Sequence, residues 1–200
     1  MTLWHWVQVA LSAGAAIEIA LGASLLFVRA PCDARGLSEA ITIALRGMQR
    51  DLAESIAQAC HPAWAAQAWT VGLSAASAGS GAAARQAVEE LRFDVVARAA
   101  ERLRRLSAVA RIASTLAFLA IILELASAFH GEHGLLALQR GLVERLAIES
   151  ALLSFGIGLA TSGACLSAAT PMRAQLRALS SELHRLAQRI GPSVHDSADM

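Results

Sequence analysis

Two long apolar runs in the C-terminal half of the chain constrain its fold more than any other feature. They are residues 112–129 (IASTLAFLAIILELASAF) and residues 146–169 (LAIESALLSFGIGLATSGACLSAA), and each contains a single charged side chain, Glu124 and Glu149 respectively. An apolar run of about 20 residues is long enough to cross the hydrocarbon core of a bilayer as a helix. We therefore expect residues 106–169 to form a pair of transmembrane helices joined by a short outer turn.

Both glutamates are expected to avoid lipid, because a charged side chain at the bilayer centre costs roughly 2.5–3.5 kcal/mol on insertion scales. Small and weakly polar residues recur at helical spacing on one face of each run: Ala113, Ala117, Ala120, Glu124 and Ser127 in the first, and Ser150, Ser154, Gly158, Thr161 and Cys165 in the second. Such a face either packs closely against another helix or lines a narrow polar path. The sequence leaves both interpretations open.

A third apolar run lies near the N-terminus, at residues 4–28, and predicts a first transmembrane helix within residues 1–28. Trp4 and Trp6 are placed where an interfacial aromatic belt lies. Small side chains indicate a packed helix rather than a lone anchor, namely Ala10, either Ala13 or Gly14, and Ser24. Glu18, near the middle of the run, is either a glutamate hydrogen-bonded between helices or a secondary candidate for carrying an ion.

Composition supports the membrane class. The chain has 200 residues, of which 56% are hydrophobic and only 16% are charged, with a mean hydropathy of +0.49, and an ordinary soluble domain is less apolar than this. A soluble helical bundle with buried carboxylates is the alternative. The net charge of +1 offers no basic field for nucleic acid. Three cysteines without a CxxC pair predict neither a disulfide framework nor a zinc site.

The arginines predict the orientation. Arg29 and Arg35 follow the first run, whereas no basic residue precedes it. Further arginines cluster just before the second run and just after the third, and loops rich in arginine stay in the cytoplasm. We expect an N-terminus outside and a C-terminus in the cytoplasm.

The segment between the first two spans, residues 29–105, is expected to be cytoplasmic and helical. One helix is predicted over residues 37–60, ended by the His61-Pro62 pair, because the residue before proline disfavours the helical conformation. A second is predicted over residues 63–78, followed by a break at residues 78–81.

From Ala82 the helical pattern continues without interruption to Phe129, which predicts one long helix that starts in the cytoplasm and crosses the membrane. Beyond the third span, Thr170-Pro171 is expected to separate it from a basic amphipathic helix over residues 172–190, which Gly191-Pro192 should stop. Residues 170–200 are then a cytoplasmic helix and tail. The fold class is an all-α membrane protein with three transmembrane helices, the second and third extending into the cytoplasm.

The outer turn contains His130 and His133, but no third strong ligand is fixed nearby, so we expect no metal and no cofactor. Nothing resembles a nucleophile elbow or a phosphate loop, so we do not expect an enzyme.

This order of parts resembles the MotA/TolQ/ExbB proton-channel family over essentially the whole chain. The resemblance is closest where a charged helix leads into residues 106–114 (LSAVARIAS). It continues at Ala151-Leu152 and at Ile157-Gly158-Leu159, which look like an AL…(I/A)GL signature of the family's last span.

The chain departs from that family at the positions that matter for conduction. A gap-free placement puts Ile121 where the family has a threonine, and Glu124 where it has a glycine. In the last span, Phe155 takes a threonine position and Ser150 a glutamate position, and the family's proline near the end of that span is missing. A shift of one residue would instead match Glu149 and Ser154, and both placements stay open.

The resemblance implies a channel-forming subunit of an ion-driven membrane motor, in which proton or sodium flow moves a partner. It also implies a homo-oligomeric ring in the lipid bilayer around a single-span partner with a membrane aspartate, similar to TolR or ExbD. Carboxylates and hydroxyls are the groups such a path needs, which makes these residues the candidates: Glu124, Glu149, Ser150, Ser154 and Thr161. The alternative is a degenerate, non-conducting homologue that serves as a membrane scaffold or assembly subunit; the lost threonines favour it and the retained glutamates disfavour it.

Overall fold

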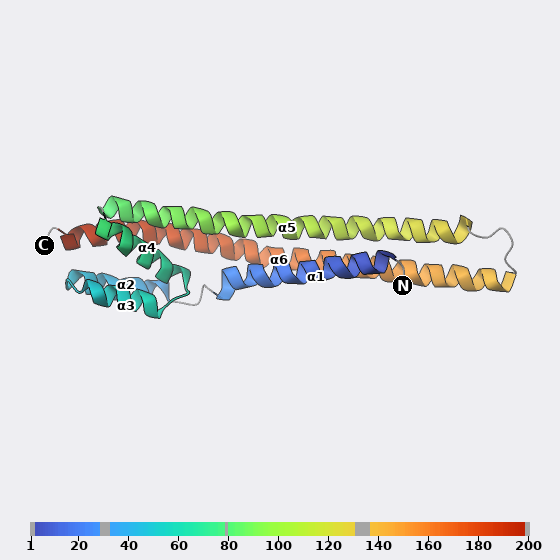
Figure 1. Ribbon diagram of the computed structural model, residues 1–200, viewed down its shortest axis with the longest axis horizontal. Coiled ribbons are helices and arrows are strands. Elements are labelled where there is room, and N and C mark those ends of the chain that lie inside the picture. Colours follow the sequence, from blue (N-terminus) through green and yellow to red (C-terminus); the bar gives the residue numbers. More distant parts are fainter. Residues whose placement is uncertain (1–2, 29–32, 79, 131–136, 199–200) are drawn as a thin grey trace. The chain divides into compact units, whose positions relative to one another are not determined.

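The computed structural model describes residues 3–28, 33–78, 80–130 and 137–198, and these residues lie in helices or in short connections between them. The elements are α1 (Leu3–Ala23), the π-helix η1 (Ser24–Val28), α2 (Ala34–Arg46), α3 (Arg50–Ala59), α4 (Trp64–Ala78), α5 (Gly81–His130) and α6 (Ala137–Ala198), as labelled in Figure 1. No strand occurs among the described residues. The predicted all-α class is confirmed.

Three of these helical segments are long and apolar enough to cross a membrane. They are His5–Phe27, the Gly81–Glu124 part of α5 and the Arg145–Ser193 part of α6. The prediction of three apolar helices suited to a bilayer is therefore confirmed, and it rests on length and composition.

The two long helices differ in how well the sequence predicted them. α5 runs for 50 residues without a break, as expected. α6 runs for 62 residues and continues through both prolines that were expected to interrupt it, so that prediction is wrong. A proline removes one backbone hydrogen bond. However, Ala169, two residues before Pro171, and Met172, directly after it, are buried, and their packing supports the helix on both sides. Thr170 Oγ1 also donates to the Leu166 carbonyl at 3.2 Å.

The single helix predicted over residues 37–60 is instead two helices. α2 ends at Arg46, and Met48 has a φ of 55°, in the left-handed region, so the chain turns before α3 begins. Gly47 caps α2 by donating its backbone N–H to the Ile43 carbonyl at 3.1 Å. The predicted stop at His61-Pro62 is confirmed, because α3 ends at Ala59.

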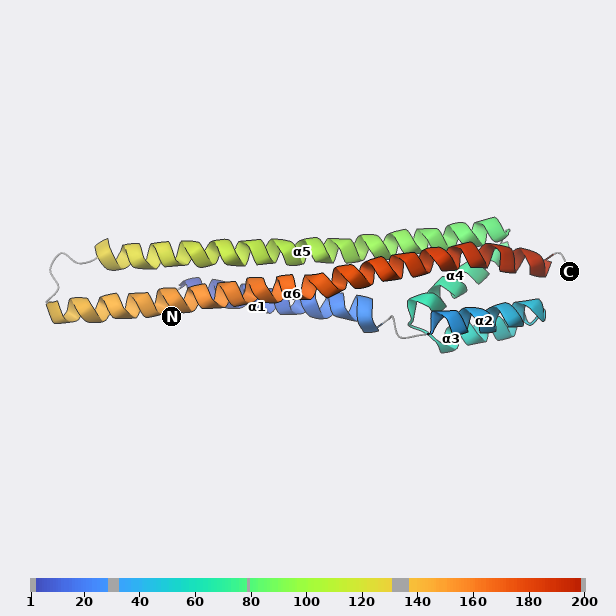
Figure 2. The same cartoon turned by 180° about the vertical axis from the view of Figure 1, so that it is seen from behind.

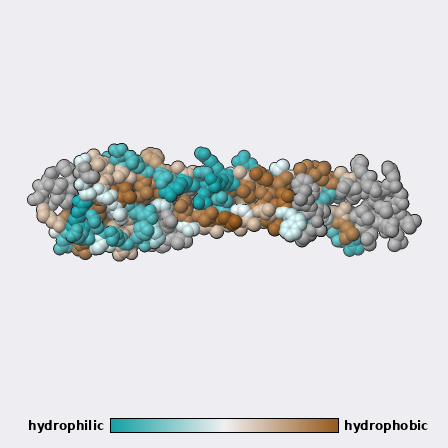
Figure 3. Space-filling model, viewed as in Figure 1, coloured by the Kyte–Doolittle hydropathy of each residue, from teal (hydrophilic) through white to brown (hydrophobic). Residues whose placement is uncertain are grey.

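The chain divides into two compact units. Unit 1 consists of Met1–Leu21 and Arg102–Pro171, and unit 2 consists of Gly22–Glu101 and Met172–Met200. In unit 1, α1 lies alongside the parts of α5 and α6 that belong to this unit, as both views show (Figures 1 and 2). Its described surface is rich in hydrophobic side chains (Figure 3), including Trp6, Ile17, Phe118, Ile122, Leu146 and Leu152. Such a surface suits contact with lipid.

Unit 2 packs α2, α3 and α4 with the first part of α5 and the last part of α6. Trp64 and Trp69 are buried in its core. Trp64 Nε1 donates to the carbonyl of Leu25 in η1 at 2.9 Å. At Gly72, an added Cβ would lie 2.9 Å from Ile190 Cγ2, so α4 and α6 are in direct contact there.

Candidate functional site

The inward face of α5 in unit 1 is the stripe of small residues found in the sequence. Ala113, Ala117 and Ala120 have no exposed surface, and Glu124 on the same face is 7% exposed. Alanines at this spacing leave little side-chain bulk between helices, so a neighbouring helix can approach closely. The side chain of Ser127, the last residue predicted on this stripe, lies outside the described residues.

The corresponding face of α6 is also buried. It comprises Ser154, Gly158, Thr161 and Cys165, while Ser150 is only half-buried. Gly158 lies in close contact with α5, because a Cβ added there would lie 2.5 Å from the Ala117 Cβ. The rings of Phe118 and Phe155 meet edge to face beside it, with centroids 5.3 Å apart. The two small-residue faces therefore pack against each other.

The first helix contributes a polar inward face that the sequence analysis missed. His5, Gln8 and Ser12 recur at i, i+3 and i+7, and both His5 and Gln8 are buried. The Ser12 and Thr161 hydroxyls are 2.6 Å apart and share a hydrogen bond. The missed signal was the helical spacing of three polar residues in an apolar run.

The face that the sequence proposed for packing of α1 is not the buried one. Ala10, Ala13 and Ser24 are exposed, and Gly14 is half-buried with nothing within 4 Å of an added Cβ. These four residues therefore do not mark the buried face of the first helix. Ala15, which is buried, lies on that face.

Glu18 faces other helices, in line with one of the two interpretations left open. Its carboxylate lies 3.4 Å from Arg102 Nη1 and 3.7 Å from Arg105 Nη1, both on α5. A carboxylate held by two guanidinium groups joins α1 to α5 by charge. This environment favours a structural role for Glu18 over that of an ion carrier.

As antiparallel neighbours, the second and third apolar runs predict Glu149 as the nearest partner of Glu124, but the two side chains have different environments in the single chain. The Glu149 side chain is 58% exposed, and its carboxylate accepts from Arg145 Nε at 3.0 Å, one turn earlier on α6. Glu124, in contrast, is buried on the inward face of α5. A proton shared between these two carboxylates therefore has no support in the single chain.

Two buried polar groups in unit 1 lack hydrogen-bond partners among the described residues. They are the amide of Gln8, at both its nitrogen and its oxygen, and the hydroxyl of Ser154. Both side chains have no exposed surface. Leaving such a group unsatisfied costs about 1–3 kcal/mol. With Glu124, Ser12 and Thr161 they form what we call the polar interior of unit 1: Gln8, Ser12, Glu124, Ser154 and Thr161.

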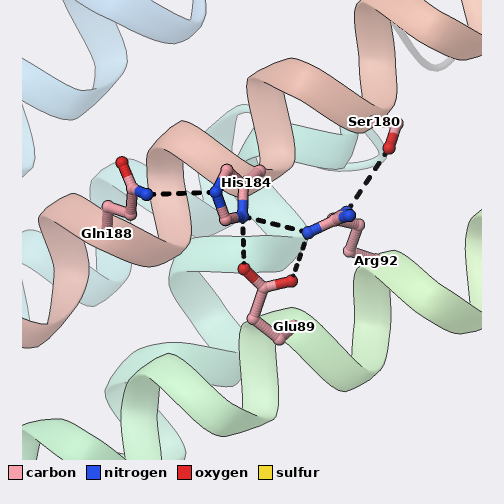
Figure 4. A network of polar contacts seen from close by, with 5 residues as sticks. All are labelled: Glu89, Arg92, Ser180, His184 and Gln188. Atoms are coloured by element: carbon pink, nitrogen blue, oxygen red, sulfur yellow. Dashed lines mark hydrogen bonds and ion pairs between the residues drawn. The ribbon is translucent and has the colours of Figure 1, made fainter.

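A second polar cluster lies in unit 2 and joins α5 to α6 (Figure 4). Glu89 Oε1 is 2.6 Å from His184 Nδ1, and Glu89 Oε2 accepts from Arg92 Nη1 at 2.6 Å. Arg92 also donates to Ser180 Oγ at 3.4 Å, and the Gln188 amide reaches the other ring nitrogen of His184 at 3.0 Å. Each member is bonded to at least one other member, so we interpret this cluster as a structural link between the two helices.

The fold and the polar interior together define an all-helical protein with three segments suited to crossing a membrane. Comparison with protein-family models, with curated proteins and with solved structures finds no significant match for this chain. The candidate site therefore rests on its own geometry. The predicted histidine-containing outer turn includes residues 131–136, which lie outside the described residues.

Proposed function

We propose that this protein is a multi-pass subunit of the bacterial inner membrane that conducts a monovalent cation, a proton or sodium, and couples its flow to the movement of a partner. The observation that carries the proposal is the polar interior of unit 1. Three helices that could each have been wholly apolar inside instead bury one carboxyl, one amide, one imidazole and two hydroxyl groups. The Thr161 hydroxyl is bonded to that of the half-buried Ser12. Polar and ionisable groups at membrane depth are costly and commonly mark ion paths.

The chemistry of these groups fits passage of a cation. The Glu124 carboxylate supplies negative charge, and the hydroxyls of Ser154 and Thr161 supply oxygen atoms at successive levels of α6. Ser154 and Thr161 are seven residues apart, which places them about 10 Å apart along the helix axis. Oxygen atoms spaced over such a distance can pass a cation in steps.

The proposed setting follows from the resemblance to the MotA/TolQ/ExbB proton-channel family. In this proposal several copies form a ring around a single-span partner with a membrane aspartate, and the chain itself carries out no enzymatic reaction. The N-terminus lies outside and the C-terminus in the cytoplasm, because the arginines cluster on the cytoplasmic side of each span.

Ion flux into proteoliposomes tests the proposal. Wild-type protein should carry sodium or protons down an imposed gradient, and Glu124→Gln should lower the rate at least tenfold while the protein still assembles. Glu149→Gln is the matched control, because Glu149 is exposed and already paired with Arg145. Equal flux through wild-type protein and Glu124→Gln would contradict a role for Glu124 in conduction.

A scaffold without transport is the second candidate, and two contacts favour it. The Ser12–Thr161 hydrogen bond and the Glu18–Arg102 ion pair both join helices and need no ion to explain them. Interhelical polar contacts of this kind stabilise membrane bundles by about 0.6 kcal/mol on average. A wild-type protein that assembles in membranes but carries no ion, alone or with its partner, would favour the scaffold.

A further inference from the structure

Gln8 is the least expected residue of the polar interior. It lies on α1, it has no exposed surface, and neither atom of its amide has a hydrogen-bond partner among the described residues. The hydroxyl of Ser154 on α6 is buried to the same extent and is likewise without such a partner. Two unsatisfied groups from two different helices thus face the same interior.

Their positions are linked through Gly158. A Cβ added at Gly158 would lie 3.2 Å from Gln8 Nε2, so the amide sits directly over this glycine. Ser154 precedes Gly158 by one helical turn on the same face of α6, about 6 Å along the axis. The amide and the hydroxyl are therefore on adjacent turns of one interior surface.

The buried carboxylate of Glu124 faces the same region. Glu124 follows Ala117 by seven residues on α5, and Ala117 meets Gly158 across the helix pair. Because α5 and α6 are antiparallel, the Glu124 backbone lies about 5 Å beyond the level of Ser154. Helical side chains lean toward the N-terminus of their own helix, which brings the carboxylate back toward that level.

We propose that Gln8, Ser154 and Glu124 bind a sodium ion inside unit 1, with the carbonyl oxygen of Gln8 as a ligand from the first helix. An amide carbonyl and a hydroxyl are neutral oxygen donors that coordinate a metal cation but have almost no affinity for a proton. Glu124 supplies the negative charge that a buried cation requires. The close contact at Gly158 leaves little space, which favours sodium over the larger potassium ion.

The inference rests on the proposed cation-conducting function, which it deepens by naming the ion and one further ligand. It also explains why an amide without a hydrogen-bond partner is buried at position 8. A leucine at position 8 would remove the cost of burying that amide, so without sodium a Gln8→Leu variant should be at least as stable as the wild-type protein.

Thermal unfolding of the purified full-length protein in detergent tests the site without measuring transport. A ligand that binds only the folded state raises the unfolding temperature. Sodium chloride should raise it above the value in choline chloride at equal ionic strength, in a saturable way, and potassium chloride should not. Gln8→Leu and Ser154→Ala should each lose this sodium-specific shift.

Ser12→Ala is the matched control, because the Ser12 hydroxyl is already bonded to Thr161. This variant should keep the sodium-specific shift even if its unfolding temperature is lower. Three results would overturn the site: no sodium-specific shift in the wild-type protein, an equal effect of potassium, or a shift that Gln8→Leu retains. The first is the result expected if the polar groups bind only water. A sodium-specific shift without flux in proteoliposomes would uphold the site and reject conduction. Flux without a sodium-specific shift would uphold conduction and reject the site.

Discussion

The buried and half-buried polar side chains of unit 1 differ in what satisfies them, and this difference separates support from function at the scale of single residues. Ser12 bonds to Thr161, and Glu18 faces two arginines, so Ser12 and Glu18 join helices, while Thr161 does so in addition to its place in the proposed cation path. Gln8 and Ser154 have no such bonds among the described residues. A group that a protein buries at a cost, without a compensating bond, is a better candidate for ligand binding than a group that is already paired.

Glu182, in the part of α6 that belongs to unit 2, gives a prediction of pH dependence. Burial raises the pKa of its carboxyl above the ordinary value of 4.5. The folded state therefore holds this proton more tightly than the unfolded state, and stability from the protonated form is lost as pH rises through the raised pKa. Glu182→Gln should raise the unfolding temperature at pH 8 relative to wild type, with a smaller difference at pH 4. A variant less stable than wild type at pH 8 would contradict the prediction.

At the scale of helices, Gly158 sets how closely α5 and α6 approach. An added Cβ would lie 2.5 Å from the Ala117 Cβ and 2.9 Å from the Ala113 carbonyl oxygen, distances that real atoms do not tolerate. One partner is the backbone of α5, which cannot move aside as a flexible side chain can. The contact is therefore a fixed point in the packing of unit 1.

We predict that Gly158→Ala destabilises the protein by about 1–3 kcal/mol, the usual cost of overpacking a tight core. The control is Gly156→Ala on the same helix, where nothing lies within 4 Å of an added Cβ. Alanine favours the helix over glycine, so the control should lose no stability. Thermal unfolding in detergent compares the two variants, and equal behaviour would show that α5 and α6 are not in close contact at this point.

The sequence predicted the long α5 because charged and apolar residues both keep a helical period without a breaker from Gly81 to His130. It failed at α6 because proline was treated as a stop, although the packing of residues on both sides of it holds the helix. It failed at α2 and α3 because a turn of three residues leaves the apolar period almost unchanged. Within that turn Met48 is left-handed, and the intrinsic preference of methionine gives little indication of that conformation.

The candidate site was predicted in part for a similar reason. The stripes on α5 and α6 were found because small residues repeat along them, and Ser154, Thr161 and Glu124 are buried on those faces. Gln8 was missed because polar residues in α1 were considered singly rather than by their spacing. Glu149 was expected in the interior because it is the only charge in its run, but the run does not show that Arg145 pairs with it.

At the scale of the whole molecule, the distribution of arginine predicts which ends of the helices meet the cytoplasm. Five arginines lie in or just before the start of the second apolar run: Arg98, Arg102, Arg104, Arg105 and Arg111. The turn between the second and third runs contains only Arg140 and Arg145. Positively charged residues near the ends of a span stay on the cytoplasmic side. Residue 90 should therefore lie inside, and residue 135 outside.

Cysteine labelling in bacterial spheroplasts tests this topology. Glu90 is exposed on α5, so a cysteine there is open to reagent on whichever side it lies. In a background without the three native cysteines, Leu135→Cys should react with a membrane-impermeant maleimide in intact spheroplasts, and Glu90→Cys should react only after lysis. The N-terminus, one span away from residue 90, should then be reached from outside together with residue 135. Labelling of residues 90 and 135 from the same side would mean that α5 does not cross the membrane, and conduction through the polar interior would lose its basis.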